Sequence, residues 1–372
     1  MNLHDAHRLT PVINAAGTFT PLGVSRSSAA VAQAVSQALG GFFVIDELQA
    51  AASRAVSVWT GAEAAAVTHC VAAGITLAVA ACMAGDSDAA VAALPDASGL
   101  PNRVIIPAGH AVNYGHPITT DVRLAGAQPV LAGSEASCTV HDIDTALAHE
   151  RTAGLLLVSS RLVQGQHVDL ADAVAAAHRR GVPAIIDGAA QDMRIEALLV
   201  TGADIVLVSA HKYLASPTAG LIIGRRSMVQ ACRAHERGIG HAMKASKEAI
   251  VGVIAAIDER TRLDRRAWRD EQDRKVTWFV EQLAALPGQT ASAVPDPAGM
   301  PFARVGVDVN AATCSFTAAS LAAALRDGTP SVRLMEHGAA EGRLTLELVP
   351  LNERELHLIV DRLAGLLVNP RR

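Results

Sequence analysis

The chain has 372 residues, of which 50% are hydrophobic and 18% are charged, and its formal net charge is -4. This apolar content can build a large core and excludes intrinsic disorder, while the lack of excess positive charge argues against a nucleic-acid partner. No basic segment followed by an apolar one opens the chain, and the apolar run from Ala64 to Ala84 contains His69. Neither secretion nor a membrane partner is therefore expected. Five scattered cysteines without a C-x-x-C pair indicate reduced thiols in a cytoplasm and no metal site.

Between residues 60 and 225, short apolar runs alternate with alanine-rich helical stretches. Runs that are apolar throughout predict strands buried on both faces, as in an α/β fold with a mostly parallel sheet and helices on each side. Predicted strands cover residues 64–68, 103–107, 128–131, 154–159, 183–187, 204–209 and 219–224, and predicted helices cover 71–84, 169–180 and 195–201. The segment 85–101 is expected to be a surface loop.

The pattern changes after Lys244. A charged helical segment continues to about Leu286, and a Pro- and Gly-rich break follows it. Predicted strands at 303–308, 331–335 and 343–347 and helices at 316–326 and 352–367 then form a small α+β unit. We expect an N-terminal segment 1–45 near the small domain and the active site, a large domain 46–250, and a connecting helix with a small C-terminal domain at 251–372.

Lysine is rare in this chain. Of 32 Lys and Arg residues, only four are lysines: Lys212, Lys244, Lys247 and Lys275. Lys212 follows the predicted strand 204–209, where partial loss of water lowers the pKa of an amine and frees it to form a Schiff base. A solvated loop lysine is the alternative interpretation, but the neighbouring hydroxyl and imidazole groups favour a chemical role. The other three lysines lie in a charged helical region, where a solvated face is the simpler explanation.

Polar residues also follow other predicted strands, and ligands of open α/β sheets bind beyond the carboxyl ends of strands. Asp187 ends the strand 183–187 and either caps a turn or, with Lys212, holds a protonated pyridine nitrogen. His69 and Cys70 precede an Ala- and Gly-rich helix whose first N–H groups suit a phosphate. His110 could stack on an aromatic cofactor or be a purely structural histidine.

Several segments carry a resemblance that covers most of the chain. They are Asn14-Ala15-Ala16-Gly17-Thr18, Leu22-Gly23-Val24-Ser25, Thr60-Gly61-Ala62-Glu63-Ala64-Ala65, Asp187-Gly188-Ala189-Ala190-Gln191, Ser209-Ala210-His211-Lys212 and Met243-Lys244-Ala245-Ser246-Lys247-Glu248. With these segments the chain resembles enzymes of fold type I that depend on pyridoxal 5'-phosphate (PLP). More narrowly, it is similar to the selenocysteine synthase-like, D-glucosaminate-6-phosphate ammonia-lyase-like family. The resemblance implies a PLP-dependent transferase-like α/β fold with a small α+β C-terminal domain.

The resemblance also implies roles for individual residues. Lys212 would form the Schiff base, Asp187 would pair with the pyridine nitrogen, and His110 would stack on the ring. The cofactor phosphate would be surrounded by His69, Cys70 and Ser209, with Thr218 reaching the phosphate of a neighbouring subunit. The protein would then be a homodimer or a larger homo-oligomer.

The substrate side is less defined. Fold-type I enzymes often bind the substrate carboxylate with an arginine of the C-terminal domain, and Arg333 and Arg343 both lie on predicted strands there. Lys244 and Lys247 could bind a distal anion or simply line a solvated helix face. Where relatives carry Gly-Arg-Pro-Met-Lys, this chain has Gly240-His241-Ala242-Met243-Lys244, so an arginine that could meet an anionic substrate is absent.

The activity implied is Cα-proton abstraction from a small amino acid. An α,β-eliminating ammonia-lyase that yields a keto acid is favoured. A racemase or epimerase, with His211 or His110 as the second acid, comes next, followed by an aminotransferase and a β-replacing transferase. A catalytically inactive homologue is the non-enzymatic alternative, against which the presence of Lys212 and Asp187 argues. A nucleotide-binding protein is disfavoured because the glycine-rich fingerprint is missing.

Overall fold

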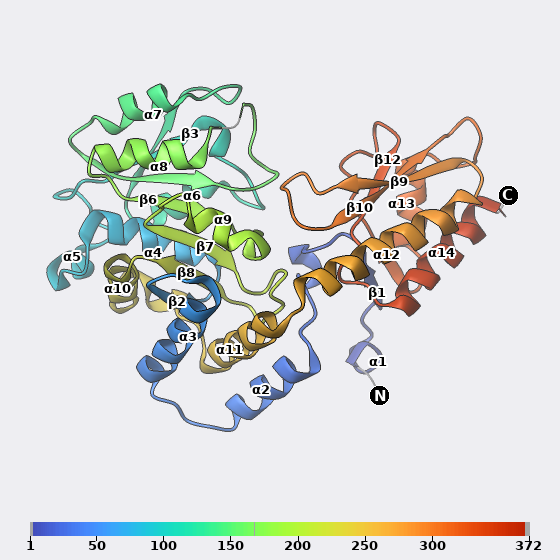
Figure 1. Ribbon diagram of the computed structural model, residues 1–372, viewed down its shortest axis with the longest axis horizontal. Coiled ribbons are helices and arrows are strands. Elements are labelled where there is room, and N and C mark those ends of the chain that lie inside the picture. Colours follow the sequence, from blue (N-terminus) through green and yellow to red (C-terminus); the bar gives the residue numbers. More distant parts are fainter. Residues whose placement is uncertain (1–2, 167, 369–372) are drawn as a thin grey trace. The chain divides into compact units, whose positions relative to one another are not determined.

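The computed structural model describes residues 3–166 and 168–368, which form two compact units (Figure 1). Residues 27–262 make up the sheet unit, and residues 3–26 together with 263–368 make up the terminal unit. The sequence analysis placed the divisions after residues 45 and 250 instead. The difference arises because α2 (Ala29–Leu39) and α3 (Ile45–Thr60) both pack on α11 (Lys247–Arg262) within the sheet unit.

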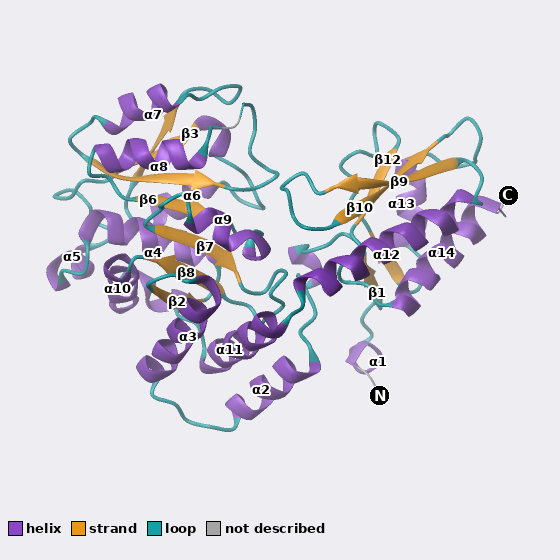
Figure 2. Cartoon of the chain, viewed as in Figure 1, coloured by secondary structure: helices purple, strands orange, loops and turns teal. Residues whose placement is uncertain are grey.

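The sheet unit contains a seven-stranded sheet with the order β2-β8-β7-β6-β5-β3-β4 (Figure 2). Only β8 runs antiparallel to its two neighbours, which confirms the predicted mostly parallel sheet. The other six strands therefore end at the same edge. The strands are β2 (Ala64–Thr68), β3 (Arg103–Pro107), β4 (Gln128–Ala132), β5 (Thr152–Val158), β6 (Ala184–Asp187), β7 (Ile205–Ser209) and β8 (Gly220–Gly224).

Both faces of the sheet are covered by helices, and successive side chains along each strand alternate between two cores. On β7, Val206 and Val208 belong to one core, whereas Ile205 and Leu207 belong to the other. The first core is completed by α3, α7 (Val140–Leu147), α8 (Leu170–Arg179) and α11, and the second by α4 (Val71–Ala84), α6 (Ile118–Leu124) and α10 (Arg226–Ala234). Within the described residues, no helix is both long and apolar enough to cross a membrane.

Three local assignments differ from the sequence analysis. The predicted loop 85–101 contains a short helix, α5 (Asp88–Ala93). The predicted continuous helical segment after Lys244 is two helices, α11 and α12 (Arg265–Ala284), because the Asp264 carboxylate accepts N–H bonds from Arg266 and Ala267 and starts a new helix. The predicted break after α12 contains a strand, β9 (Gln289–Pro295).

The terminal unit is an α+β structure, as predicted. β10 (Ala303–Val309) pairs antiparallel with β9 and with β12 (Arg343–Leu346), and β1 (Val12–Asn14) pairs parallel with β11 (Ser331–Arg333). The helices α12, α13 (Ala318–Arg326) and α14 (Glu353–Val368) complete its core. The remaining short helices are α1 (Leu3–His7) in this unit and α9 (Ile195–Leu199) in the sheet unit.

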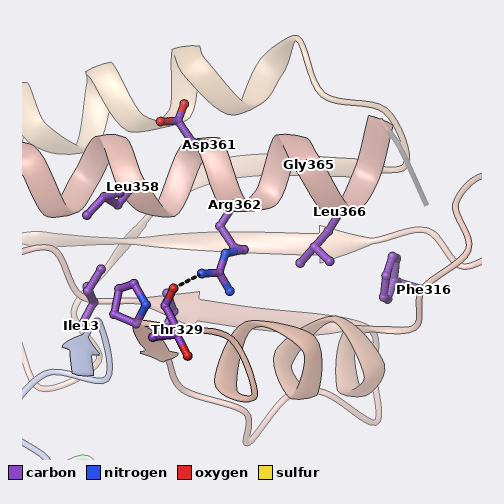
Figure 3. A pocket seen from close by; sticks show the side chains of 10 residues that line it. Ile13, Phe316, Thr329, Leu358, Asp361, Arg362, Gly365 and Leu366 are labelled. Carbon is purple, nitrogen blue, oxygen red and sulfur yellow. Dashed lines mark hydrogen bonds between the residues drawn. The ribbon is translucent and has the colours of Figure 1, made fainter. Parts of the chain in front are cut away.

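A cavity of about 630 Å³ lies inside the terminal unit, between α14 and the β1–β11 pair (Figure 3). Ile13, Val332 and Leu358 give it an apolar lining. The Arg362 guanidinium points into the cavity and donates to the Thr329 carbonyl at 2.8 Å. The lining includes none of the site residues predicted from the sequence.

The edge strand β2 leads into the candidate site, and side chains of α3 satisfy its outer backbone groups. Gln49 donates from Nε2 to the Val67 carbonyl at 2.7 Å and accepts from the Val67 N–H at 2.9 Å. The Ser53 hydroxyl accepts from the Ala65 N–H at 2.9 Å. An exposed sheet edge would otherwise invite pairing with another chain, so α3 both protects the edge and fixes the direction of β2.

We expect Gln49→Ala to lower the free energy of unfolding by about 2–4 kcal/mol, because two buried backbone groups lose their partners. Urea unfolding followed by circular dichroism measures this change. Gln33→Ala, an exposed glutamine on α2, is the matched control and should change stability little. Equal stability of the two variants would show that the Gln49 bonds do not stabilise the edge.

Candidate functional site

Lys212 lies in the turn that follows β7. The turn is closed by backbone bonds from Ala215 N–H to the Lys212 carbonyl at 3.1 Å and from Ser216 N–H to the Ala210 carbonyl at 3.0 Å. Burial lowers the pKa of the Lys212 amine, while the carboxylates of Asp187 and Asp192 act in the opposite direction. Lys212 is half-buried, so its amine is partly shielded from water and close to negative charge.

Asp187 is the last residue of β6, and only 5% of its surface is exposed. Its Oδ1 accepts an N–H bond from Ala189 at 2.9 Å. Burial raises the pKa of Asp187 to about 6, although the Lys212 charge and the Ala189 N–H oppose this shift. Asp187 and Lys212 are 25 positions apart in the sequence, but in the structure each charge acts on the pKa of the other group. These are the two residues that the sequence analysis singled out.

His110 closes a short 3₁₀ helix (Ala108–His110) after β3 and is 4% exposed. Its Nδ1 accepts the Val158 N–H at 2.9 Å, and Val158 lies beside Asp187 in the β5–β6 register. In the neutral ring the hydrogen is therefore on Nε2. This bond fixes the orientation of the imidazole next to the strand that carries Asp187.

The ends of β2 and β7 and the start of β8 meet around His211. Its Nδ1 lies 3.1 Å from the Ala219 carbonyl and 3.2 Å from the Ser209 Oγ. Burial lowers the pKa of His211, and the His69 ring lies close enough to act electrostatically on it. These contacts tie the His211 ring to the β8 strand, so that it braces the strand ends.

A close approach of backbone makes this corner possible. A Cβ on Gly220 would lie 2.5 Å from the carbonyl carbon of Cys70 and 2.8 Å from the Val71 nitrogen, so a larger residue would force the backbone apart. Glycine at this position therefore allows the start of α4 to lie close against β8. Thr218, two residues earlier, is exposed, and its predicted contact with a neighbouring subunit stays a prediction.

The two predicted substrate lysines have different surroundings. The backbone of Lys244 forms an isolated antiparallel bridge with Thr68 at the end of β2, and the Lys244 Nζ lies 3.3 Å from His241 Nδ1. Lys247 instead donates to the carbonyls of Leu39 and Gly41 at 3.2 and 2.5 Å, which caps the C-terminus of α2. The sequence analysis did not foresee this structural use of Lys247.

The two predicted substrate arginines belong to the terminal unit. The exposed Arg343 forms a two-pronged ion pair with Asp308, with N···O distances of 2.7 and 2.8 Å. Arg333 is half-buried and donates from Nε to the Ser331 hydroxyl at 2.9 Å. Since the Arg343 guanidinium is already paired with a carboxylate, Arg333 is the stronger of the two candidates.

The sequence analysis missed a cluster between β3 and α6. The buried Asp121 carboxylate accepts from the Tyr114 hydroxyl and lies 2.9 Å from His116 Nε2. The Tyr114 side chain interacts electrostatically with Asp187 and Cys70, which places the cluster beside the candidate site. Burial raises the pKa of Asp121 and, together with the bond to Asp121, raises that of Tyr114. Asp121 lies one turn after the buried Ile118, and an acid on the apolar face of a helix is the signal that could have revealed the cluster.

Residues 12–273 match the SelA family, L-seryl-tRNA selenium transferase. D-glucosaminate-6-phosphate ammonia lyase of Salmonella typhimurium (strain 14028s / SGSC 2262) is 36% identical over 97% of this chain and 97% of its own. 5'-C-glycyluridine monooxygenase-decarboxylase of a Streptomyces species is 33% identical over 97% of this chain and 91% of its own.

Solved structures agree with this placement. A structure of D-glucosaminate-6-phosphate ammonia-lyase has a TM-score of 0.90 and 34% identity, and the match covers 99% of this chain and 98% of that one. A serine palmitoyltransferase structure with PLP, at 16% identity and a TM-score of 0.58 over 96% of this chain and 88% of its own, shares the fold. The predicted PLP-dependent-enzyme fold is therefore confirmed. From the match over residues 12–273 and the near full-length relatives, the chain belongs to the L-seryl-tRNA selenium transferase family.

Proposed function

We propose that the protein is a PLP-dependent ammonia-lyase that eliminates a β-hydroxyl group from a small 2-amino acid and releases ammonia and a keto acid. The observation that carries the proposal is the buried Asp187 carboxylate beside the shielded Lys212 amine, at the strand ends of a chain that is 36% identical to an ammonia lyase. Neither residue serves the core in the way an apolar residue would, because burying either charge costs stability.

The residues present fit the cofactor. The negative charge of the buried Asp187 carboxylate is only partly compensated by its neighbours, and a protonated pyridine nitrogen would compensate the rest. Lys212 supplies the amine that would hold the aldehyde. His110 offers a fixed planar ring beside β6. Ser209 and the first N–H groups of α4 would offer donors to the cofactor phosphate, and Gly220 lets the start of α4 come close to β8.

When bound, the cofactor supplies an electron sink that stabilises negative charge at the substrate Cα. Side chains of the protein would accept and donate the protons of the reaction. Burial keeps a larger neutral fraction of Lys212, whose Nζ can accept the Cα proton, while Asp187 keeps a proton on the ring nitrogen. His116, oriented by Asp121, would give a proton to the departing hydroxyl, so that water leaves rather than hydroxide.

The substrate's charged ends are assigned within the same proposal. Lys244, at the end of β2 and next to His241, would meet a distal anion such as the phosphate of the relative's named substrate. The arginine for the substrate carboxylate, Arg333 or Arg343 in the sequence analysis, stays a prediction. The resemblance implies an arginine where this chain has His241, so a non-phosphorylated sugar acid is the first alternative substrate.

The reaction is tested by supplying D- and L-2-amino-3-hydroxy acids, including D-glucosaminate with and without a 6-phosphate, and measuring ammonia and keto acid. Stoichiometric release of both supports the lyase. Inversion at Cα without ammonia would instead show a racemase. Oxygen uptake with release of carbon dioxide would show the reaction named for the Streptomyces relative, and either result would overturn the proposal.

The proposal also places the protein in the cytoplasm. All five cysteines are free, and they include the buried Cys138 and Cys232. Burial raises the pKa of the Cys82 and Cys232 thiols, which keeps them protonated and unreactive. Reduced, inert thiols suit a reducing compartment.

Assembly into at least a homodimer is a further part of the proposal. Residues Leu39, Phe42, Phe43, Val44 and Ile45 form an exposed apolar segment between α2 and α3, and Phe42 is fully exposed. Such a run of large apolar side chains is costly in water and suits burial against a second copy of the chain.

Substitution of Lys212 by Arg should abolish borohydride-dependent attachment of PLP and reduce ammonia release by at least about 10³-fold, because arginine cannot form the Schiff base. Peptide mass mapping measures the attachment. Lys275→Arg, in the terminal unit, is the matched control and should retain both properties. Attachment to any other lysine of the wild-type chain would contradict the assignment.

Asp187→Asn should stabilise the cofactor-free protein by about 3 kcal/mol at pH 7.5 and abolish activity. Burial raises the pKa of Asp187 from 3.8 to about 6, so the folded chain binds this proton more tightly than the unfolded chain. The protonated Asp187 carboxyl group therefore contributes to stability below pH 3.8, and this contribution is lost as the pH rises through 6. The gain in the variant should therefore shrink between pH 7.5 and 5, as urea unfolding can measure.

Asp144→Asn serves as the control for this experiment. Asp144 is a half-buried residue whose pKa is lowered by its bond to Arg180, so its substitution should not stabilise the protein at any of these pH values. A pH-independent effect of Asp187→Asn would show that the buried charge is not its cause.

Phe42→Ser should shift the protein from dimer to monomer without loss of helical content, because the most exposed apolar side chain of the proposed contact is removed. Light scattering coupled to gel filtration measures the mass. Val200→Ser, which replaces an apolar side chain that is 83% exposed elsewhere on the sheet unit, should leave the mass unchanged. A monomeric wild-type protein would contradict the proposal.

A further inference from the structure

Arg260 makes two buried contacts that the proposed reaction does not use. It lies near the end of α11, and its side chain is 8% exposed. Its Nη1 lies 3.0 Å from Oδ2 of Asp192, whose side chain is completely buried, and its Nη2 donates to the Tyr213 carbonyl at 2.6 Å. One guanidinium thus links a carboxylate and a backbone carbonyl that come from different loops.

Both of these loops carry residues of the candidate site. Asp192 follows Asp187 by five positions after β6, and Tyr213 directly follows Lys212 after β7. Arg260 therefore bridges the loop of the buried acid to the loop of the amine. A lysine in its place could not make both contacts with the same planar geometry.

The Lys212 turn is held at a second point. The Ser27 hydroxyl donates to the Ala215 carbonyl at 2.7 Å, and Ala215 has a φ of 58°, in the left-handed region that residues other than glycine rarely adopt. Backbone strain of this kind persists only where surrounding contacts enforce it. The carbonyls of Tyr213 and Ala215 are both held by side chains from outside the turn.

A buried ion pair is a poor way to gain stability, because the cost of removing two charges from water offsets their attraction, and an apolar pair of similar size would serve as well. The charge of Asp192, however, acts on Lys212. The other charged groups that act on the Lys212 amine are Asp187 and Arg161. Among the described residues, neither carboxylate oxygen of Asp192 accepts a hydrogen bond, and its Oδ2 is held by the 3.0 Å ion pair with Arg260.

We propose that Arg260 and Asp192 are positioning residues for Lys212: Arg260 fixes the turn that carries the amine, and Asp192, held by Arg260, supplies its second counter-charge. This inference rests on the proposed role of Lys212 as the reactive amine. Arg260 and Asp192 act through Lys212 and need not contact the substrate.

The test measures the reactivity of Lys212 in the full-length, cofactor-free protein after dialysis against hydroxylamine. Each variant is labelled briefly with acetic anhydride from pH 6 to 11, and the labelled fraction is read by peptide mass spectrometry. With only four lysines in the chain, each can be followed separately, and Lys275 serves as internal reference. Asp192→Asn should move the labelling midpoint of Lys212 down by about half a pH unit or more, because the loss of a negative charge disfavours the ammonium form.

Asp144→Asn is the matched control, since it breaks an exposed Asp–Arg pair in the same unit, and it should leave the Lys212 midpoint unchanged. Arg260→Lys keeps the positive charge but should speed hydrogen exchange of the amides in residues 210–216. Hydrogen exchange of the same amides should be at least as fast in Arg260→Gln as in Arg260→Lys. A purely structural pair would lower urea stability without moving the midpoint of Lys212 relative to Lys275.

If Asp192→Asn does not fold, the double variant Asp192→Asn/Arg260→Gln removes both charges and leaves no unpaired charge buried. Its Lys212 midpoint should also fall. A midpoint within about 0.2 pH units of wild type in the folded variants, with unchanged exchange in residues 210–216, would overturn the inference. Labelling needs neither cofactor nor substrate, so its outcome is separate from that of the proposed reaction, which fails if the wild-type chain binds no PLP or releases no ammonia.

Discussion

The Asp187 carboxylate lies at the end of a fully buried strand, where water cannot solvate its charge. A carboxylate in this position needs nearby positive charge or donors, or it takes up a proton. The chain provides one backbone N–H and the Lys212 ammonium, and these do not fully offset the burial. The part of the Asp187 charge that is not compensated suits this sheet edge to a cationic ring nitrogen. The same uncompensated charge lowers the stability of the protein without cofactor.

The surrounding side chains keep that edge in shape. Gln49 holds the direction of β2, His211 ties the start of β8 to the end of β7, and His110 is locked to β5. Arg260 joins the two loops that follow β6 and β7. All of these polar side chains bond to backbone, and Arg260 also pairs with the Asp192 carboxylate. They fix the strand ends and the loops after them at definite distances, which apolar contacts would do less specifically.

The relatives show that such an edge can serve more than one reaction. An ammonia lyase and a monooxygenase-decarboxylase match this chain almost equally well over nearly its whole length. The groups that would hold a cofactor are therefore weak guides to the reaction. In the proposed reaction, Lys244 beside His241 and His116 on Asp121 would be the groups that decide which bond of the substrate breaks.

The sequence by itself determined the α/β class and the mostly parallel sheet, and it singled out Lys212 and Asp187 as candidate site residues. Apolar runs ending in a polar residue report burial and strand ends, and the rarity of lysine made Lys212 conspicuous. These are local signals, so they can be read along the chain. Helix breaks were less readable: α11 ends at Arg262, and the Asp264 carboxylate starts α12 through its own bonds, within a segment of uniform charged composition.

Only the tertiary structure decided which polar groups meet. Tyr114 and His116 read as ordinary surface residues, and Arg260 as one of many arginines on a charged helix, until folding brings them to the buried carboxylates of Asp121 and Asp192. The use of Lys247 as a cap for α2 and of Arg343 as a partner for Asp308 likewise depends on neighbours more than 30 positions away. Side-chain pairing across the fold depends on distance in space, and a single sequence records distance only along the chain.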